Sequence, residues 1–142
     1  MSEAASTDRY TGQCACGAVG YEVVGMPVAE NHCQCRQCQR QTGGGRGSYL
    51  TFSGAAVAVT GEPRHWEAVG EGGTIKHSAF CGACGSPLFL TFPQMPDIFV
   101  VRAGSLDAPE RFRPQLAMWA SAGQAWDSLD PALAKFAKMP PS

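Results

Sequence analysis

Short runs of β-prone residues, separated by turn residues, fill the middle of the chain. In residues 18–25 the apolar Val19, Tyr21 and Val23 alternate with the charged Glu22, which is typical of a strand with one solvent-exposed face. Gly, Pro, Ser and Asp, the residues that tight turns favour, lie at the boundaries of the runs. The pattern predicts a mainly β domain, with six further strands within residues 47–54, 56–63, 65–73, 74–80, 86–93 and 97–106.

Helical signals are sparse. Asp130 can cap a helix near the end of the chain, Pro131 suits its first position, and residues 132–139 continue with good helix formers. After Cys38 the sequence is compatible with a short helical turn, which the TGGG at residues 42–45 stops. We therefore expect a single β domain with a short C-terminal helix.

The length and composition of the chain fit one domain with its own core. The chain has 142 residues, 44% of them hydrophobic, and domains of roughly 100–150 residues bury enough apolar surface to fold without disulfides. Residues 1–11 are expected to form a flexible N-terminal tail, and residues 12–142 the domain. The formal net charge of −1 gives no long-range attraction toward nucleic acid or acidic membranes.

The sequence shows no targeting or membrane segment. No apolar run approaches the ~20 residues of a membrane span. The N-terminus has no basic region followed by an apolar one, as a signal peptide would have. We expect a cytoplasmic protein, in a compartment where thiols are kept reduced. There, seven cysteines indicate metal binding or redox chemistry rather than structural disulfides.

The cysteines fall into groups of two, three and two. Cys81 and Cys84, followed by Gly85, form a Cys-x-x-Cys-Gly unit, the commonest half of a structural zinc site. Gly85 can adopt the left-handed backbone conformation that closes such a turn. Cys14 and Cys16 are closer together in sequence, so they must lie in a bent loop if they are to chelate one ion. The simplest assignment is one closed tetrahedral site formed by Cys14, Cys16, Cys81 and Cys84.

The middle group, Cys33, Cys35 and Cys38, leaves three thiols for a second site. Three ligands and one vacant position are typical of catalytic zinc. The alternatives are a second structural site, spare reduced thiols or a redox pair of Cys35 and Cys38. A fourth ligand that closes the site could come from His32, His65 or His77. Iron–sulfur clusters usually take four thiolates each, which seven cysteines cannot supply twice.

Three arginines, Arg36, Arg40 and Arg46, flank the middle group of cysteines. A guanidinium group pairs well with a carboxylate, so these side chains could bind the carboxylates of a substrate such as glutathione. The alternative is that they are solvated surface charges.

Three segments carry the cysteines: GQCACGAVGYEV, HCQCRQCQRQTG and AFCGACGSPLF. They resemble the G-x-C-x-C-G-x-V, C-x-C-x-x-C-R-x-x-G and F-C-x-x-C-G-x-x-L motifs of the glutathione-dependent formaldehyde-activating enzymes, a family that includes centromere-protein-V-like members. The resemblance runs from about Gly12 to Pro140. It implies a β-tent fold of two curved antiparallel sheets. It also implies a structural zinc on Cys14, Cys16, Cys81 and Cys84, and a catalytic zinc on Cys33, Cys35 and Cys38.

The activity that the resemblance implies is that of a zinc-dependent carbon–sulfur lyase acting on a thiol adduct. An example is glutathione plus formaldehyde giving S-hydroxymethylglutathione, with a small thiol as partner and two zinc ions per chain as cofactors. The chain departs from the family pattern at Ala117, where the family has His, and at Ala122 and Gly123, where it has Ser and a basic residue; Trp119 and Trp126 remain. This departure bears on whether glutathione is the substrate. The alternative function is a non-catalytic zinc-binding module that recognises a protein or a small ligand.

Overall fold

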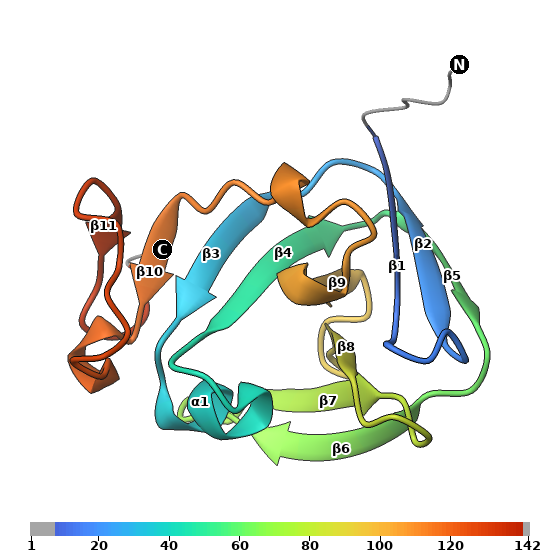
Figure 1. Cartoon of the computed structure of the whole chain (residues 1–142), viewed down its shortest axis with the longest axis horizontal. Helices are drawn as coiled ribbons and strands as arrows, with labels where there is room; N and C mark the ends of the chain where they lie inside the picture. Colours follow the sequence, from blue (N-terminus) through green and yellow to red (C-terminus); the bar gives the residue numbers. More distant parts are fainter. Residues whose placement is uncertain (1–7, 141–142) are drawn as a thin grey trace.

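The structure, a computed structural model that describes residues 8–140, is built on two β-sheets (Figure 1). The smaller sheet has three strands in the order β1-β2-β5, with all neighbours antiparallel. These strands are β1 (Arg9–Gln13), β2 (Gly20–Val24) and β5 (Ala56–Thr60). Because β1 begins at Arg9, the first strand includes the last three residues of the stretch predicted as a tail; residues 1–7 of that stretch lie outside the described part.

The larger sheet has eight strands in the order β11-β10-β3-β4-β9-β8-β7-β6. Its neighbours are antiparallel except at one edge, where β10 pairs in parallel with both β3 and β11. The seven strands predicted from the alternation pattern, β2 and β4 to β9, are all confirmed. The strands of this sheet are β3 (Ala29–Cys33), β4 (Gly47–Ser53), β6 (Arg64–Val69), β7 (Ile75–Phe80), β8 (Pro87–Thr91), β9 (Ile98–Arg102), β10 (Leu116–Met118) and β11 (Ala134–Lys135).

One α-helix, α1 (Arg36–Thr42), is present in the described residues. It begins before Cys38 rather than after it, because the Cys35 sulfur accepts a hydrogen bond from the Cys38 amide at 3.3 Å and so caps the first turn. It ends where expected, at Gly43, which has a left-handed φ of 76°. Short 3₁₀ turns occur at η1 (Ala103–Ser105), η2 (Pro109–Arg111) and η3 (Ala120–Ala122).

The predicted C-terminal helix is wrong: residues 131–139 form turns and the two-residue strand β11. The backbone of this segment bonds to β10 and the turn after it instead of to itself. Phe136 donates to the Ala117 carbonyl at 2.9 Å and accepts from Ala120 at 2.9 Å. An isolated helix of this length is marginal, so these bonds to a neighbouring strand outweigh its local propensity.

The main hydrophobic core lies between the two sheets. The Tyr10 ring meets Phe52 edge-on at 5.3 Å, and the Tyr21 ring meets Phe89 at 6.0 Å, so each contact joins a strand of the small sheet to one of the large sheet. Leu50, Phe52 and Leu88 have no exposed surface. A second, smaller group of buried side chains surrounds Cys33 and Cys38. Within residues 8–140, no helix has the length and apolar character needed to cross a bilayer.

Candidate metal centres

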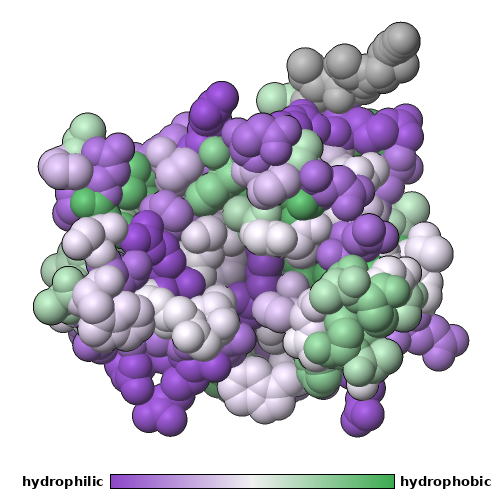
Figure 2. Space-filling model, viewed as in Figure 1, coloured by the Kyte–Doolittle hydropathy of each residue, from purple (hydrophilic) through white to green (hydrophobic). Residues whose placement is uncertain are grey.

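Cys14, Cys16, Cys81 and Cys84 come together in a four-cysteine cluster, with all sulfur atoms within 4.8 Å of one another. The Cys16 sulfur lies 3.7 Å from Cys14 and 3.7 Å from Cys81. A regular tetrahedron with metal–sulfur bonds of ~2.3 Å has edges of about 3.8 Å, so the spacing fits one tetrahedral ion. Because one pair follows β1 and the other follows β7, the cluster joins the two sheets. Figure 2 shows a hydrophobic patch at the lower right, where the loops that follow these two strands lie in Figure 1.

The backbone around the four-cysteine cluster is shaped to direct N–H groups at sulfur. Gly17 and Gly85 both have a left-handed φ of 80°, as expected for Gly85 from the sequence. The Val19 amide donates to the Cys14 sulfur at 3.3 Å, which lowers the pKa of that thiol. The Ser86 hydroxyl lies 3.2 Å from the Cys84 sulfur and lowers the pKa of Cys84 to about 5. These contacts favour the thiolate form of Cys14 and Cys84. At Cys16 the Ala18 amide lowers the pKa, but hydrogen bonds with the three neighbouring thiols outweigh it and raise the pKa to about 11, so a metal ion would displace that proton.

Cys33, Cys35 and Cys38 form a three-cysteine cluster, with sulfurs within 4.8 Å of one another. Cys33 ends β3, Cys35 caps α1, and Cys38 lies in its first turn. Without a metal, hydrogen bonds from Cys33 and Cys38, with a smaller effect of the Lys76 charge, lower the pKa of Cys35 to about 2. The same contacts and burial raise the pKa of Cys33. The cluster therefore concentrates negative charge on Cys35, and a metal ion would displace the remaining protons.

The histidines considered as a fourth ligand lie elsewhere. The His32 ring packs edge-on against Phe112 and its Nδ1 lies 2.8 Å from the Ser48 hydroxyl; burial lowers its pKa to about 4. His65 and His77 lie against each other, with ring centroids 6.4 Å apart. Within residues 8–140, no His, Cys, Asp or Glu side chain joins the three-cysteine cluster as a fourth member. The redox-pair alternative leaves Cys33, whose sulfur lies within 4.8 Å of the other two, without a role.

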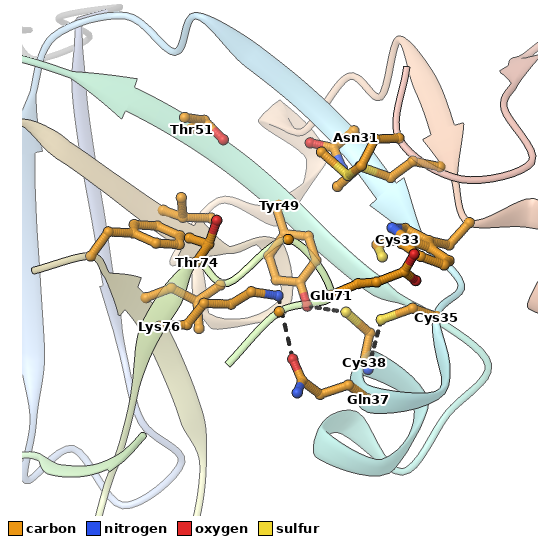
Figure 3. Close-up of a pocket in the computed structure, with 18 of the residues that line it drawn as sticks. Asn31, Cys33, Cys35, Gln37, Cys38, Tyr49, Thr51, Glu71, Thr74 and Lys76 are labelled. Carbon is orange, nitrogen blue, oxygen red and sulfur yellow. Dashed lines mark hydrogen bonds between the residues drawn. The ribbon is translucent and has the colours of Figure 1, made fainter. Parts of the chain in front are cut away.

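A cavity of about 850 Å³ opens beside the three-cysteine cluster (Figure 3), and all three cysteines line it. The four-cysteine cluster contributes no residue to this wall. Much of the lining is apolar, with Leu90, Phe92, Val100, Met118 and Trp119 among its residues. The two clusters therefore differ: one has four cysteines and joins the sheets, and the other has three cysteines and faces a cavity that can admit a small molecule.

The charged residues of the cavity wall are Lys76, Glu71 and Lys138. Glu71 pairs with Lys138 at 3.1 Å. None of the arginines flanking the cysteines lines the cavity: Arg46 instead pairs with Asp127 at 2.7 Å, and the other two, Arg36 and Arg40, are exposed. Neither lysine was predicted as a cavity residue. Alternation would assign the polar side of residues 74–80, with Lys76, to solvent, and Lys138 lies in the segment predicted as a C-terminal helix.

A buried arginine lies behind the cavity wall. Arg102 is 5% exposed, and its Nη1 donates to the Tyr49 hydroxyl at 3.3 Å, while that hydroxyl donates to the Cys38 sulfur at 3.0 Å. An arginine has only donors, so the tyrosine oxygen must accept from it and the single tyrosine proton is left for sulfur. Burial, together with the negative charge of Cys38, raises the pKa of Tyr49, so the hydroxyl keeps its proton. The Arg102 guanidinium is thus linked to the three-cysteine cluster through the Tyr49 hydroxyl.

The segment that departs from the family pattern also reaches the cavity. Trp119 lines it and has a φ of 58°, a left-handed conformation that is rare outside glycine. Its amide donates to the Lys138 carbonyl at 2.9 Å, and the Lys138 ammonium lies 5.4 Å from its ring centroid. Trp126 is 70% exposed and is not part of the cavity wall, and Ala117 is fully buried in β10. Of the two retained tryptophans, only Trp119 lines the cavity.

Comparisons with known proteins identify the family of the chain. The family model described as glutathione-dependent formaldehyde-activating enzyme matches residues 9–122. A Halomonas elongata protein named "Putative glutathione-dependent formaldehyde-activating enzyme" is 34% identical over an alignment of 111 residues, with 70% of each chain covered. A crystal structure of a Rhodobacter sphaeroides protein, 18% identical, covers 89% of this chain and 98% of its own with a TM-score of 0.49. The family match and the identity to the Halomonas relative show that the chain belongs to the glutathione-dependent formaldehyde-activating enzyme family.

Proposed function

We propose that the chain is a zinc-dependent carbon–sulfur lyase that acts on a thiol adduct, with its chemistry at Cys33, Cys35 and Cys38. The reaction is the addition of a thiol such as glutathione to formaldehyde, giving S-hydroxymethylglutathione, or the reverse cleavage. The observation that carries the proposal is the contrast between the two clusters: the three-cysteine cluster, and not the four-cysteine cluster, lines the cavity.

The four-cysteine cluster would hold a structural zinc and the three-cysteine cluster a catalytic one. The sulfur spacing and the N–H groups aimed at sulfur fit this donor set. When bound at the three-cysteine cluster, zinc would supply a Lewis-acid position for the substrate sulfur or the aldehyde oxygen. In the cytoplasm, where thiols stay reduced, both clusters would remain able to bind metal.

The reaction needs no external acid or oxidant. The sulfur of the thiol forms a bond to the aldehyde carbon, the carbonyl double bond becomes the new hydroxyl, and the thiol proton ends on that oxygen. The chain's own contribution is to bind the two reactants side by side, since orientation alone can supply a large part of a barrier reduction. Tyr49 offsets the charge on Cys38, and the apolar wall formed by Leu90, Phe92 and Trp119 excludes water.

The test measures the exchange between formaldehyde, glutathione and their adduct by NMR. The zinc-loaded protein should accelerate exchange well above the uncatalysed rate, and Cys35→Ser should lose that acceleration while keeping its fold. Cobalt-substituted protein gives a second view, because sulfur-to-cobalt charge-transfer bands should grow when a thiol is added. If neither exchange nor spectrum responds to any thiol, the enzyme proposal is wrong and a binding module becomes the better description.

A further inference from the structure

The cavity beside the three-cysteine cluster contains an ammonium group without an acidic partner. Lys76 extends from β7 to the cavity wall (Figure 3), and its Nζ donates to the Gln37 side-chain oxygen at 3.3 Å. Among the described residues, no carboxylate lies within salt-bridge distance of Lys76. The acidic residue of the wall, Glu71, is already paired with Lys138 at 3.1 Å. The positive charge of Lys76 is therefore available to a ligand.

Two glutamine amides line the same cavity, and their orientations follow from their partners. Gln37 and Gln41 lie one helical turn apart on α1, on either side of Cys38 in the sequence. The Gln41 oxygen accepts from Arg102 Nη2 at 2.7 Å, as the Gln37 oxygen does from Lys76. Lysine and arginine only donate, so each contact must use the amide oxygen, and each NH₂ group is left over. Neither NH₂ group has another hydrogen-bond partner among the described residues.

We infer that Lys76, Gln37 and Gln41 form a subsite for a carboxylate on the thiol substrate. The subsite offers one ammonium and two amide NH₂ groups, and a carboxylate accepts several hydrogen bonds and carries the matching charge. Because the two glutamines are close in sequence to Cys38, the carboxylate would bind a short distance from the substrate sulfur. The inference rests on the proposed function and narrows its substrate class to thiols that also carry a carboxylate.

A competing explanation is that Lys76 only offsets the negative charge of the cysteines. In that case a neutral thiol would bind as well as an acidic one of the same size. The two explanations therefore differ in one measurable quantity, the preference for a carboxylate over an amide.

The first experiment titrates two matched thiols, 3-mercaptopropionate and 3-mercaptopropionamide, into the cobalt-substituted protein and follows the charge-transfer bands. We expect the acid to bind at least about tenfold more tightly, as hydrogen bonds to a charged group imply. Lys76→Met should abolish the preference and Lys76→Arg should keep part of it. Lys135→Met, which changes an exposed lysine outside the cavity wall, should leave it unchanged. Equal affinities in the unchanged protein, or a preference that survives Lys76→Met, would overturn the subsite.

The second experiment separates the subsite from the proposed function, because it uses propionate, which has no thiol. Reductive methylation followed by mass spectrometry should show that propionate protects Lys76, with Lys135 as the internal reference. If propionate protects Lys76 but no thiol alters the cobalt spectrum, the proposed function is wrong and the subsite stands. If thiols bind without preference and propionate gives no protection, the subsite is wrong and the function stands. If no thiol and no carboxylate binds, both are wrong.

Discussion

The hydroxyl of Tyr49 donates a hydrogen bond to the sulfur of Cys38 at 3.0 Å, and both side chains are about 5% exposed. Arg102 fixes the direction of this bond, because its Nη1 occupies the acceptor side of the hydroxyl at 3.3 Å. A hydrogen bond to a thiolate favours its charged form, which is the form that binds a metal. Tyr49 should therefore increase the metal affinity of the three-cysteine cluster at neutral pH.

Replacing Tyr49 by Phe should weaken zinc binding at the three-cysteine cluster by about tenfold, the lower end of the usual effect of such supporting hydrogen bonds. The measurement is competition with a chromophoric zinc chelator at pH 7. The free energy of unfolding should also fall by about 1–3 kcal/mol, because buried Arg102, whose Nε already has no hydrogen-bond partner among residues 8–140, loses an acceptor.

Tyr21→Phe is the matched control. Tyr21 is buried to a similar degree, and its hydroxyl lies 2.6 Å from that of Ser105, away from the three-cysteine cluster. Loss of the Tyr21 hydroxyl should lower the free energy of unfolding by about 1 kcal/mol without changing the zinc affinity of the three-cysteine cluster. An equal loss of zinc affinity in both variants would show that the effect of Tyr49 is a general loss of stability.

The sequence predicted strands well where alternation and turn residues agree, and it failed where tertiary pairing decides. The β3 segment, Ala29–Cys33, shows no clear alternation; it is a strand because β4 and β10 pair with its two edges. The converse holds for residues 131–139, which have good helix propensity but bond to the β10 segment. Local propensity is a weak prior in both cases, because neighbouring strands supply the backbone partners.

The grouping of the cysteines was predictable from the sequence, whereas the cavity was not. Both cysteine clusters contain the residues expected, because a short spacing keeps sulfurs close in almost any turn. The cavity wall depends on which face of β7 turns inward. Thr74 and Lys76 line the cavity, and Ser78 contacts Arg102, so the polar side of this stretch faces the interior. Alternation alone would assign such a polar side to solvent.

Asp127 should hold the segment after η3 against the loop that follows α1. Its carboxylate accepts from Arg46 at 2.7 Å and from the Gln34 amide at 3.1 Å, with 14% of its side chain exposed. The Arg46 contact lowers the pKa of Asp127, so this stabilisation is present above the pKa of the unfolded chain, about 4, and is lost as pH falls through the lowered folded value.

Asp127→Asn should therefore lower the free energy of unfolding at neutral pH by about 2 kcal/mol, as measured by urea denaturation. The difference from the unchanged protein should be constant above about pH 5 and should shrink in more acidic solution. Asp107→Asn is the control, since Asp107 accepts one exposed hydrogen bond from Thr11 at 2.8 Å. A loss of similar size at Asp107 would contradict the anchoring role of Asp127.

The two clusters should respond differently to the loss of one ligand. Cys84→Ser removes a ligand from the cluster that joins the two sheets, and structural zinc contributes on the order of 10 kcal/mol to the folding of small zinc domains. Its melting temperature and solubility should fall strongly. Cys35→Ser should lose one equivalent of metal and keep its fold, as judged by circular dichroism. Equal thermal destabilisation by the two substitutions would mean that the three-cysteine cluster is structural as well.

Metal removal should also distinguish the two clusters. We expect two zinc ions per chain in freshly purified, untagged protein, and a chelator should remove them in two separate phases. The first phase should release one zinc without a change in secondary structure, because the three-cysteine cluster lines an open cavity through which a chelator can reach it. The second should coincide with loss of the β-sheet signal, since the four-cysteine cluster joins the sheets. In Cys35→Ser the first phase should be absent and the second unchanged. Release of both ions in one step that unfolds the chain, or an elemental analysis that finds iron, would contradict the assignment of one structural and one catalytic zinc.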